Sequence, residues 1–181
     1  MKLLRSRRES LGRGRVTRRP SRQGQSTVEL ALVLPLLIIL LSVIIEAGLA
    51  LNSWMRVNTA ARDAVRFSLD AGRPSDTATL VLNKLVGMDR NQITVYIVRG
   101  KTDANGDISN WVEDRRWGSG SLRVKRGDIQ ARLADPANPN ANKNMTFTIV
   151  EVDYNYSPLL ATLVARNSFI PMTSYAIVQQ Y

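Results

Sequence analysis

Residues 24–67 read GQSTVELALVLPLLIILLSVIIEAGLALNSWMRVNTAARDAVRF, and this stretch decides the fold. From Leu30 to Ile45 it contains sixteen residues in a row without a charge. Continued to Leu51, the apolar segment has 22 residues, and such a helix spans about 33 Å, enough for a hydrocarbon core of about 30 Å. A buried helix of a soluble domain would show a polar stripe, which this run lacks. The stretch therefore predicts one transmembrane helix.

Most of the basic charge lies before this helix. Residues 1–24 hold nine basic side chains and one acidic side chain, so they carry +8 of the chain's net +10. A basic segment directly before an apolar span is a signal for a cytoplasmic N-terminus. We therefore expect a protein of the bacterial cytoplasmic membrane, with its N-terminus inside and the chain after about residue 52 outside. A nucleic-acid partner is not expected, because no second basic patch with interleaved aromatic residues follows.

A small residue, Gly24, separates the basic segment from the apolar run, and Glu29 follows five residues later. A secretory signal has its cleavage site after the apolar run, whereas the small residue here comes before it. This arrangement resembles the leader of bacterial prepilins and predicts cleavage after Gly24. The new α-amino group on Gln25 would lie four residues before Glu29, on the same helical face. Glu29 would then pair with that group on a neighbouring subunit; the alternative is a charge at the headgroup edge, stabilised by the helix N-terminus.

Three further residues of the helix are candidates for contacts with other transmembrane helices. Pro35 removes a backbone hydrogen bond and predicts a kink or a local loosening. Glu46 is expected near the outer interface, where its carboxylate reaches water or makes a register-setting contact with another helix. Gly48 allows another helix to approach closely.

Beyond the membrane the helix is expected to continue, because residues 52–71 keep a helical period without proline or glycine. The later chain predicts a second helix, strands and connecting segments. These are a helix over 76–86 capped by Ser75, strands over 93–98, 145–152 and 175–179, a loop over 135–144 and a short helix over 158–165. The predicted fold is α+β: a long N-terminal transmembrane helix that extends into a small extracytoplasmic domain with an antiparallel sheet. The expected divisions are a basic cytoplasmic leader over 1–24, the transmembrane and extended helix over 25–72, and the extracytoplasmic domain over 73–181.

The composition argues against catalysis. The chain contains no cysteine and no histidine, which removes disulfides, thiolate nucleophiles and the commonest general base and metal ligand. The sequence patterns of hydrolase nucleophiles, phosphate-binding loops and dinucleotide-binding turns do not occur in it. We therefore expect a protein that is not an enzyme.

One local motif leaves two interpretations open. Residues 103–107 read DANGD, with oxygen-bearing side chains at alternating positions, as at the start of an EF-hand calcium loop. The candidate calcium ligands are Asp103, Asn105, Asp107, Ser109 and Asp114. The alternative is a hairpin turn, for which Asn-Gly is a strong signal, and Ile108 stands where the calcium loop needs glycine. Apart from calcium, no cofactor is expected.

Taken together, Gly24 to Phe67 resembles the N-terminal region of TadE-like proteins, which are minor pilins or pseudopilins of the tight-adherence (Flp-type) pilus system. The resemblance covers 44 of 181 residues. Its elements are Gly24 and Glu29, the Leu34-Pro35-Leu36 step, the Ile45-Glu46-Ala47-Gly48 step and the run from Asn58 to Asp63. The resemblance implies processing by a prepilin peptidase, residence in the membrane, contact with other pilins or pilus assembly proteins, and a place in a surface pilus that serves adhesion.

The expected function is therefore that of a structural minor pilin or pseudopilin-like membrane protein in the assembly of a tight-adherence pilus or a related secretion apparatus. The alternative is a single-pass, membrane-anchored extracytoplasmic binding domain that does not enter a filament. Cleavage after Gly24 distinguishes the two, because a plain anchor would keep its basic segment.

Overall fold

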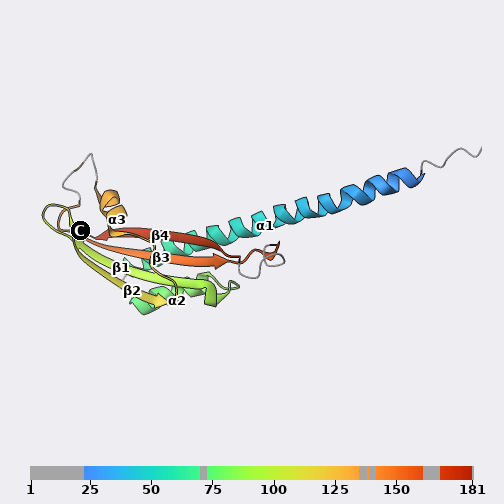
Figure 1. Ribbon diagram of the computed structural model, residues 1–181. Helices are drawn as coiled ribbons and strands as arrows, with labels where there is room; N and C mark the ends of the chain where they lie inside the picture. The colour runs from blue at the N-terminus through green and yellow to red at the C-terminus, as the bar shows by residue number, and fades with distance from the viewer. Residues whose placement is uncertain (1–22, 70–72, 135–137, 139–141, 161–167, 181) are drawn as a thin grey trace, which may run out of the picture. The chain divides into compact units, whose positions relative to one another are not determined.

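The computed structural model describes residues 23–69, 73–134, 138, 142–160 and 168–180 (Figure 1). Its elements, in chain order, are α1 (Gln23–Leu69), α2 (Pro74–Lys84), the 3-10 helix η1 (Arg90–Gln92), β1 (Ile93–Thr102), β2 (Ile108–Trp117), α3 (Arg126–Leu133), β3 (Thr146–Tyr156) and β4 (Ile170–Gln180). The four strands form one antiparallel sheet in the order β2-β1-β3-β4. The predicted α+β fold, a long apolar helix followed by a small domain with an antiparallel sheet, is confirmed.

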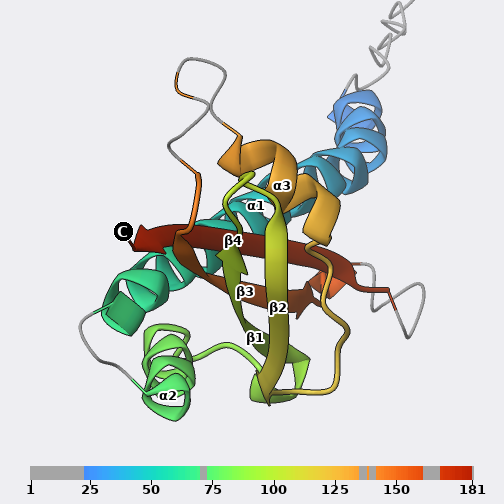
Figure 2. The same ribbon diagram turned by 90° about the vertical axis from the view of Figure 1, so that its left-hand side faces the viewer.

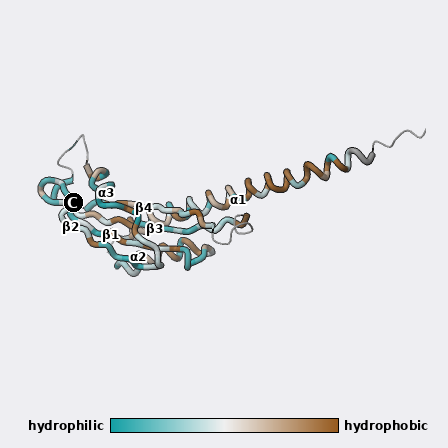
Figure 3. Tube along the Cα trace, viewed as in Figure 1, coloured by the Kyte–Doolittle hydropathy of each residue, from teal (hydrophilic) through white to brown (hydrophobic). Residues whose placement is uncertain are grey.

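The first helix, α1, is 47 residues long and continues through Pro35. Its large side chains from Val28 to Leu51 are exposed all round the helix, and Figure 3 shows this part of α1 as the most apolar part of the chain. Among the described residues it is the one helix long and apolar enough to cross a membrane, and none of its most apolar window is buried. These properties suit membrane anchoring.

The chain divides into two units, Met1–Leu40 and Leu41–Tyr181. Within the second unit, the last part of α1 packs against the sheet through small side chains. Its buried residues are Val57, Ala60, Ala61, Ala64 and Val65. These residues form one core with buried side chains of β1 and β3. On the same face, α2 contributes Ala78, Val81 and Leu82 to the same core, and its C-cap residue Leu85 is buried there too.

The opposite face of the sheet is covered by α3 and by the segment that leads into it from β2. Figure 2 shows α3 in front of the sheet and α1 behind it. The second core consists of Val98, Ile108, Val124, Ile129, Leu133, Phe147 and Ile149. Because both faces are covered, the inner strand β3 is buried along nearly its whole length.

The strands and the helix predicted after α1 are present in the structure, with bounds that differ from the predicted ones. The predicted strands are present as β1, β3 and β4, each longer than expected. The cap prediction is wrong: α2 begins at Pro74, Arg73 occupies the N-cap position without a side-chain cap bond, and the Ser75 hydroxyl donates to Asp76 instead. Proline supplies the helix start here, because its fixed φ suits the first turn and its missing N–H is one that needs no partner there.

Some predictions fall outside the described residues. These are the basic segment up to residue 22, most of the loop over 135–144 and most of the short helix over 158–165. The expected divisions after residues 24 and 72 stay predictions. The strand β2 and the helix α3 lie in a stretch where the sequence predicted no regular element.

Candidate functional site

The leader residues lie at the start of α1. Gly24, Gln25 and Glu29 all fall within the helix, so Gln25 and Glu29 are one helical turn apart, as expected. The side chain of Glu29 is exposed. Cleavage after Gly24 and the pairing of Glu29 with a neighbour stay predictions.

The candidates for helix packing, Pro35 and Gly48, lie on exposed parts of α1. A Cβ atom added to Gly48 would meet no atom within 4 Å. The surface at this glycine is therefore open to a second helix, and contacts with other transmembrane helices stay a prediction.

The third packing candidate, Glu46, has partners within its own chain. Its carboxylate accepts a hydrogen bond from the Tyr156 hydroxyl at 2.6 Å through Oε1. Through Oε2 it accepts bonds from the backbone N–H groups of Leu159 at 3.0 Å and Leu160 at 3.4 Å. Tyr156 is the last residue of β3, so Glu46 joins the C-terminal part of the apolar segment to the end of the sheet where β3 stops.

The Tyr156 hydroxyl is held as a donor in this contact. Burial, together with the hydrogen bond to the Glu46 carboxylate, raises the pKa of Tyr156 to about 12. The phenol therefore keeps its proton at physiological pH. The sequence did not predict this contact, because the two residues lie 110 positions apart and neither has a neighbouring motif that points to the other.

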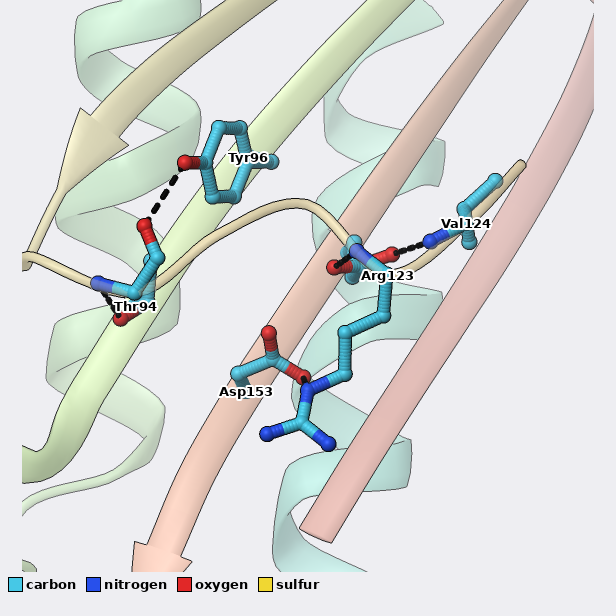
Figure 4. A network of polar contacts seen from close by, with 7 residues as sticks. Thr94, Tyr96, Arg123, Val124 and Asp153 are labelled. Carbon is cyan, nitrogen blue, oxygen red and sulfur yellow. Dashed lines mark hydrogen bonds and ion pairs between the residues drawn. The ribbon is translucent and has the colours of Figure 1, made fainter. Parts of the chain in front are cut away.

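A second polar cluster lies on the sheet face under α3. Glu151 and Asp153 are two residues apart in β3 and share this face; their side chains are 0% and 7% exposed. The Glu151 carboxyl accepts backbone N–H bonds from Arg123 at 2.8 Å and from Val124 at 2.7 Å. The Arg123 Nε atom lies 3.5 Å from Asp153 Oδ1. Figure 4 shows how the segment from β2 crosses the strands and brings these groups together.

Burial controls the charge of this pair. It raises the pKa of Glu151 to about 7, against the opposing effect of the two N–H donors. Burial also raises the pKa of Asp153, while Thr173 and Arg123 act to lower it. A signal for the pair does exist in the sequence, since acids two apart in an otherwise apolar strand must share one face. Nothing in the local sequence, however, indicates the backbone donors that Glu151 receives from residues 27 and 28 positions away.

Two residues of β1 also hold the segment between β2 and α3, at a point closer to β2. The Tyr96 hydroxyl donates to the Gly120 carbonyl at 2.8 Å, and the Gly120 N–H donates to Thr94 Oγ1 at 3.1 Å. Thr94 and Tyr96 pair with Asp153 and Glu151 across the two strands. The cluster therefore fixes the path of the segment that connects β2 to α3, and its chemistry is that of a structural polar network.

The candidate calcium ligands lie in and after the hairpin between β1 and β2. The Asp103 carboxylate accepts the backbone N–H groups of Asn105 and Asp107, and Gly106 has a positive φ of 89°, as a tight turn requires.

The other two candidates point elsewhere. The Ser109 hydroxyl donates to the Lys101 carbonyl. Asp114 forms an ion pair with Arg116 and sits opposite Ile97, well along β2 from the turn. The five residues are not brought together, and among the described residues no group of three His, Cys, Asp or Glu side chains is gathered to hold a metal. The geometry favours the turn, and calcium binding stays a prediction without support from it.

Comparison with known proteins adds one finding. A family model described as TadE-like protein matches residues 24–66. Searches among curated proteins and solved structures gave no match. The matched residues start at the glycine of the predicted leader and end in the part of α1 that packs on the sheet. Residues 24–66 are thus similar to TadE-like proteins, which confirms the resemblance that the sequence predicted.

Proposed function

We propose that this protein is a minor pilin or pseudopilin-like subunit that serves in the assembly of a tight-adherence pilus or a related secretion apparatus. The observation that carries the proposal is the TadE-like match over residues 24–66, because it covers the leader junction, the apolar helix and the start of the packed helix at once. The match supports a pilus-related function and membrane association; the role of a minor pilin is our inference from it.

The proposed activity is structural and not catalytic. The apolar half of α1 would pack against other pilins or pilus assembly proteins in the membrane, through the exposed surface that includes Pro35 and Gly48. The domain that contains the sheet would lie outside the cytoplasmic membrane. There it would make contacts with other subunits or with a surface. The basic N-terminal segment supports this orientation.

Processing tests the proposal against a plain membrane anchor. With a prepilin peptidase present, we expect cleavage after Gly24 and a mature N-terminus at Gln25. The intact mass of the protein extracted from membranes would show the loss of residues 1–24. As a control, Gly24→Leu should keep the segment, because the small residue at the cut is then gone. A wild-type chain that keeps its basic segment in the presence of the peptidase would favour the anchored binding domain instead.

Assembly tests the proposed role of Glu29. Glu29→Gln keeps the size of the side chain but removes its charge, so cleavage and membrane insertion should survive while incorporation with other pilins falls. Glu29→Asp keeps the charge and should retain more of the incorporation. Cross-linking yield or co-purification of the processed chains measures the difference. Equal incorporation of all three proteins would mean that Glu29 is a helix-end charge without a pairing role.

A further inference from the structure

The contacts of Glu46 set the position along α1 of Leu159 and Leu160, which follow β3. Glu46 lies within the apolar segment, five residues before its end at Leu51, which is about 7.5 Å along a helix. The backbone N–H groups of Leu159 and Leu160 bond to its carboxylate. These two residues therefore lie beside the apolar segment itself, and not beyond its outer end.

Three apolar side chains at this end of the sheet are exposed. Leu159, Phe169 and Ile170 are 65%, 45% and 48% exposed. Ile170 is the first residue of β4 and pairs with Tyr156, the last residue of β3, so these residues lie around one sheet end. Among the described residues from Tyr154 to Gln180, no side chain is charged. The edge strand β2, at the opposite side of the sheet, differs, since it carries Glu113, Asp114, Arg115 and Arg116.

The polar groups at this end are satisfied internally. A backbone N–H without a partner costs several kcal/mol in hydrocarbon, and a charged carboxylate is also costly there. Here the Glu46 carboxylate accepts from two such N–H groups and from the Tyr156 hydroxyl. Each group thus removes the other's need for water.

We propose that this sheet end, with the exposed side chains of Leu159, Phe169 and Ile170, is a membrane-contact surface that lies in the outer leaflet beside the transmembrane helix. Its partner is the acyl and interfacial region of the lipid that α1 itself crosses. Phe169 supplies an exposed aromatic side chain, a type that favours the membrane interface. The outer domain is then held at the membrane by two elements, α1 and the sheet end, so its tilt and rotation about α1 are restricted.

The proposal can be tested by spin labelling, because the native chain contains no cysteine. The full chain would carry one cysteine at a time, at Phe169 or at Ile170, and would be placed singly in nanodiscs of phosphatidylethanolamine and phosphatidylglycerol. Collision of the label with oxygen, which concentrates in lipid, is compared with collision with a water-soluble nickel complex. Val112→Cys is a matched control, since Val112 is 47% exposed on β2. Leu40→Cys reports whether α1 itself is inserted.

We expect the ratio of oxygen to nickel collisions at Phe169→Cys and Ile170→Cys to be close to that at Leu40→Cys and well above that at Val112→Cys. A ratio equal to that at Val112→Cys, with Leu40→Cys in lipid, would overturn the proposal. The proposal would also be overturned if the labels at these sites were protected from nickel only when two copies share a disc, because a second copy and not lipid would then cover the surface.

Glu46→Ala adds a test of what holds the sheet end in place. Without the carboxylate, the N–H groups of Leu159 and Leu160 need water, so the ratio at Ile170→Cys should fall toward that at Val112→Cys. An unchanged ratio would overturn the role of Glu46 in the proposal. These measurements need no pilus machinery, so their failure is separate from a failure of the proposed function.

Discussion

The buried carboxyl of Glu151 makes the stability of the outer domain depend on pH, and Glu151→Gln is the change that tests this. The carboxyl is 0% exposed and accepts two backbone N–H bonds. The titratable and charged groups around it are Asp153 of its own strand, Tyr96 of β1, Tyr175 of β4 and Arg123 of the covering segment. Glutamine keeps one acceptor oxygen, but its amide group then faces the second N–H donor.

The size of the effect follows from the pKa. The folded value of Glu151 is raised from 4.5 to about 7, so between these values the folded state binds the proton that the unfolded state has released. The contribution to stability is therefore present at low pH and is lost as the pH rises through about 7. The part of this contribution that is lost between pH 5 and pH 8 amounts to about 2–3 kcal/mol of the free energy of unfolding. The raised pKa of Asp153 acts in the same direction and remains in the variant.

Urea unfolding of the full chain in a mild detergent, followed by tryptophan fluorescence at several values between pH 5 and pH 8, would measure the slope. Wild type should lose stability with rising pH, and Glu151→Gln should lose about 2–3 kcal/mol less over this range. At pH 5 the variant should be less stable than wild type by about 1–3 kcal/mol, because a buried N–H is left without an acceptor. Asp128→Asn, at an exposed carboxylate of α3, should keep the wild-type slope. Parallel slopes for wild type and Glu151→Gln would refute the reasoning.

Two further predictions concern packing and topology. Gly100→Ala should lower the free energy of unfolding by about 1–3 kcal/mol, because its Cβ would overlap the buried ring of Phe147. The control is Gly127→Ala in α3, where a Cβ meets nothing within 4 Å, and this change should be neutral or slightly stabilising. Equal effects of the two substitutions in urea unfolding would contradict the packing of Gly100 against Phe147. Ser119→Cys, exposed after β2, should react with a membrane-impermeant maleimide in spheroplasts; reaction only after lysis would reverse the proposed orientation.

The elements with strong periodic patterns could be predicted from the sequence. The apolar run and the helical period after it predicted α1, and alternation of apolar residues predicted β1 and β3. The strand β2 was missed because it is an edge strand whose side chains are largely exposed, so they need not alternate. The helix α3 was missed because it has eight residues and buries only Ile129 and Leu133, which is too short a pattern to distinguish from a polar loop.

The hydrogen-bond partners of the buried and half-buried acids could not be predicted from local sequence, for a different reason. The N-terminal candidates could be named because leader, helix and glutamate follow one another in the chain. The partners of Glu46 and Glu151 instead come from segments that are brought near only by the pairing of β3 within the sheet. A buried acid in a strand can be suspected from its apolar neighbours, but the donors that satisfy it depend on the path of a connecting segment, which no local pattern specifies.

The two edges of the sheet have a consequence for how copies of this chain can aggregate. An edge strand offers unpaired backbone groups, and charged side chains or proline on it discourage pairing with a strand of another molecule. On β2, four consecutive charged residues, Glu113 to Arg116, meet this need. On β4, Pro171 removes one donor, and Arg132 covers the ring of Tyr175 at 5.1 Å. Replacement of the β2 charges by threonine and valine would leave the fold's cores untouched and still make the protein prone to amyloid-like stacking during overexpression.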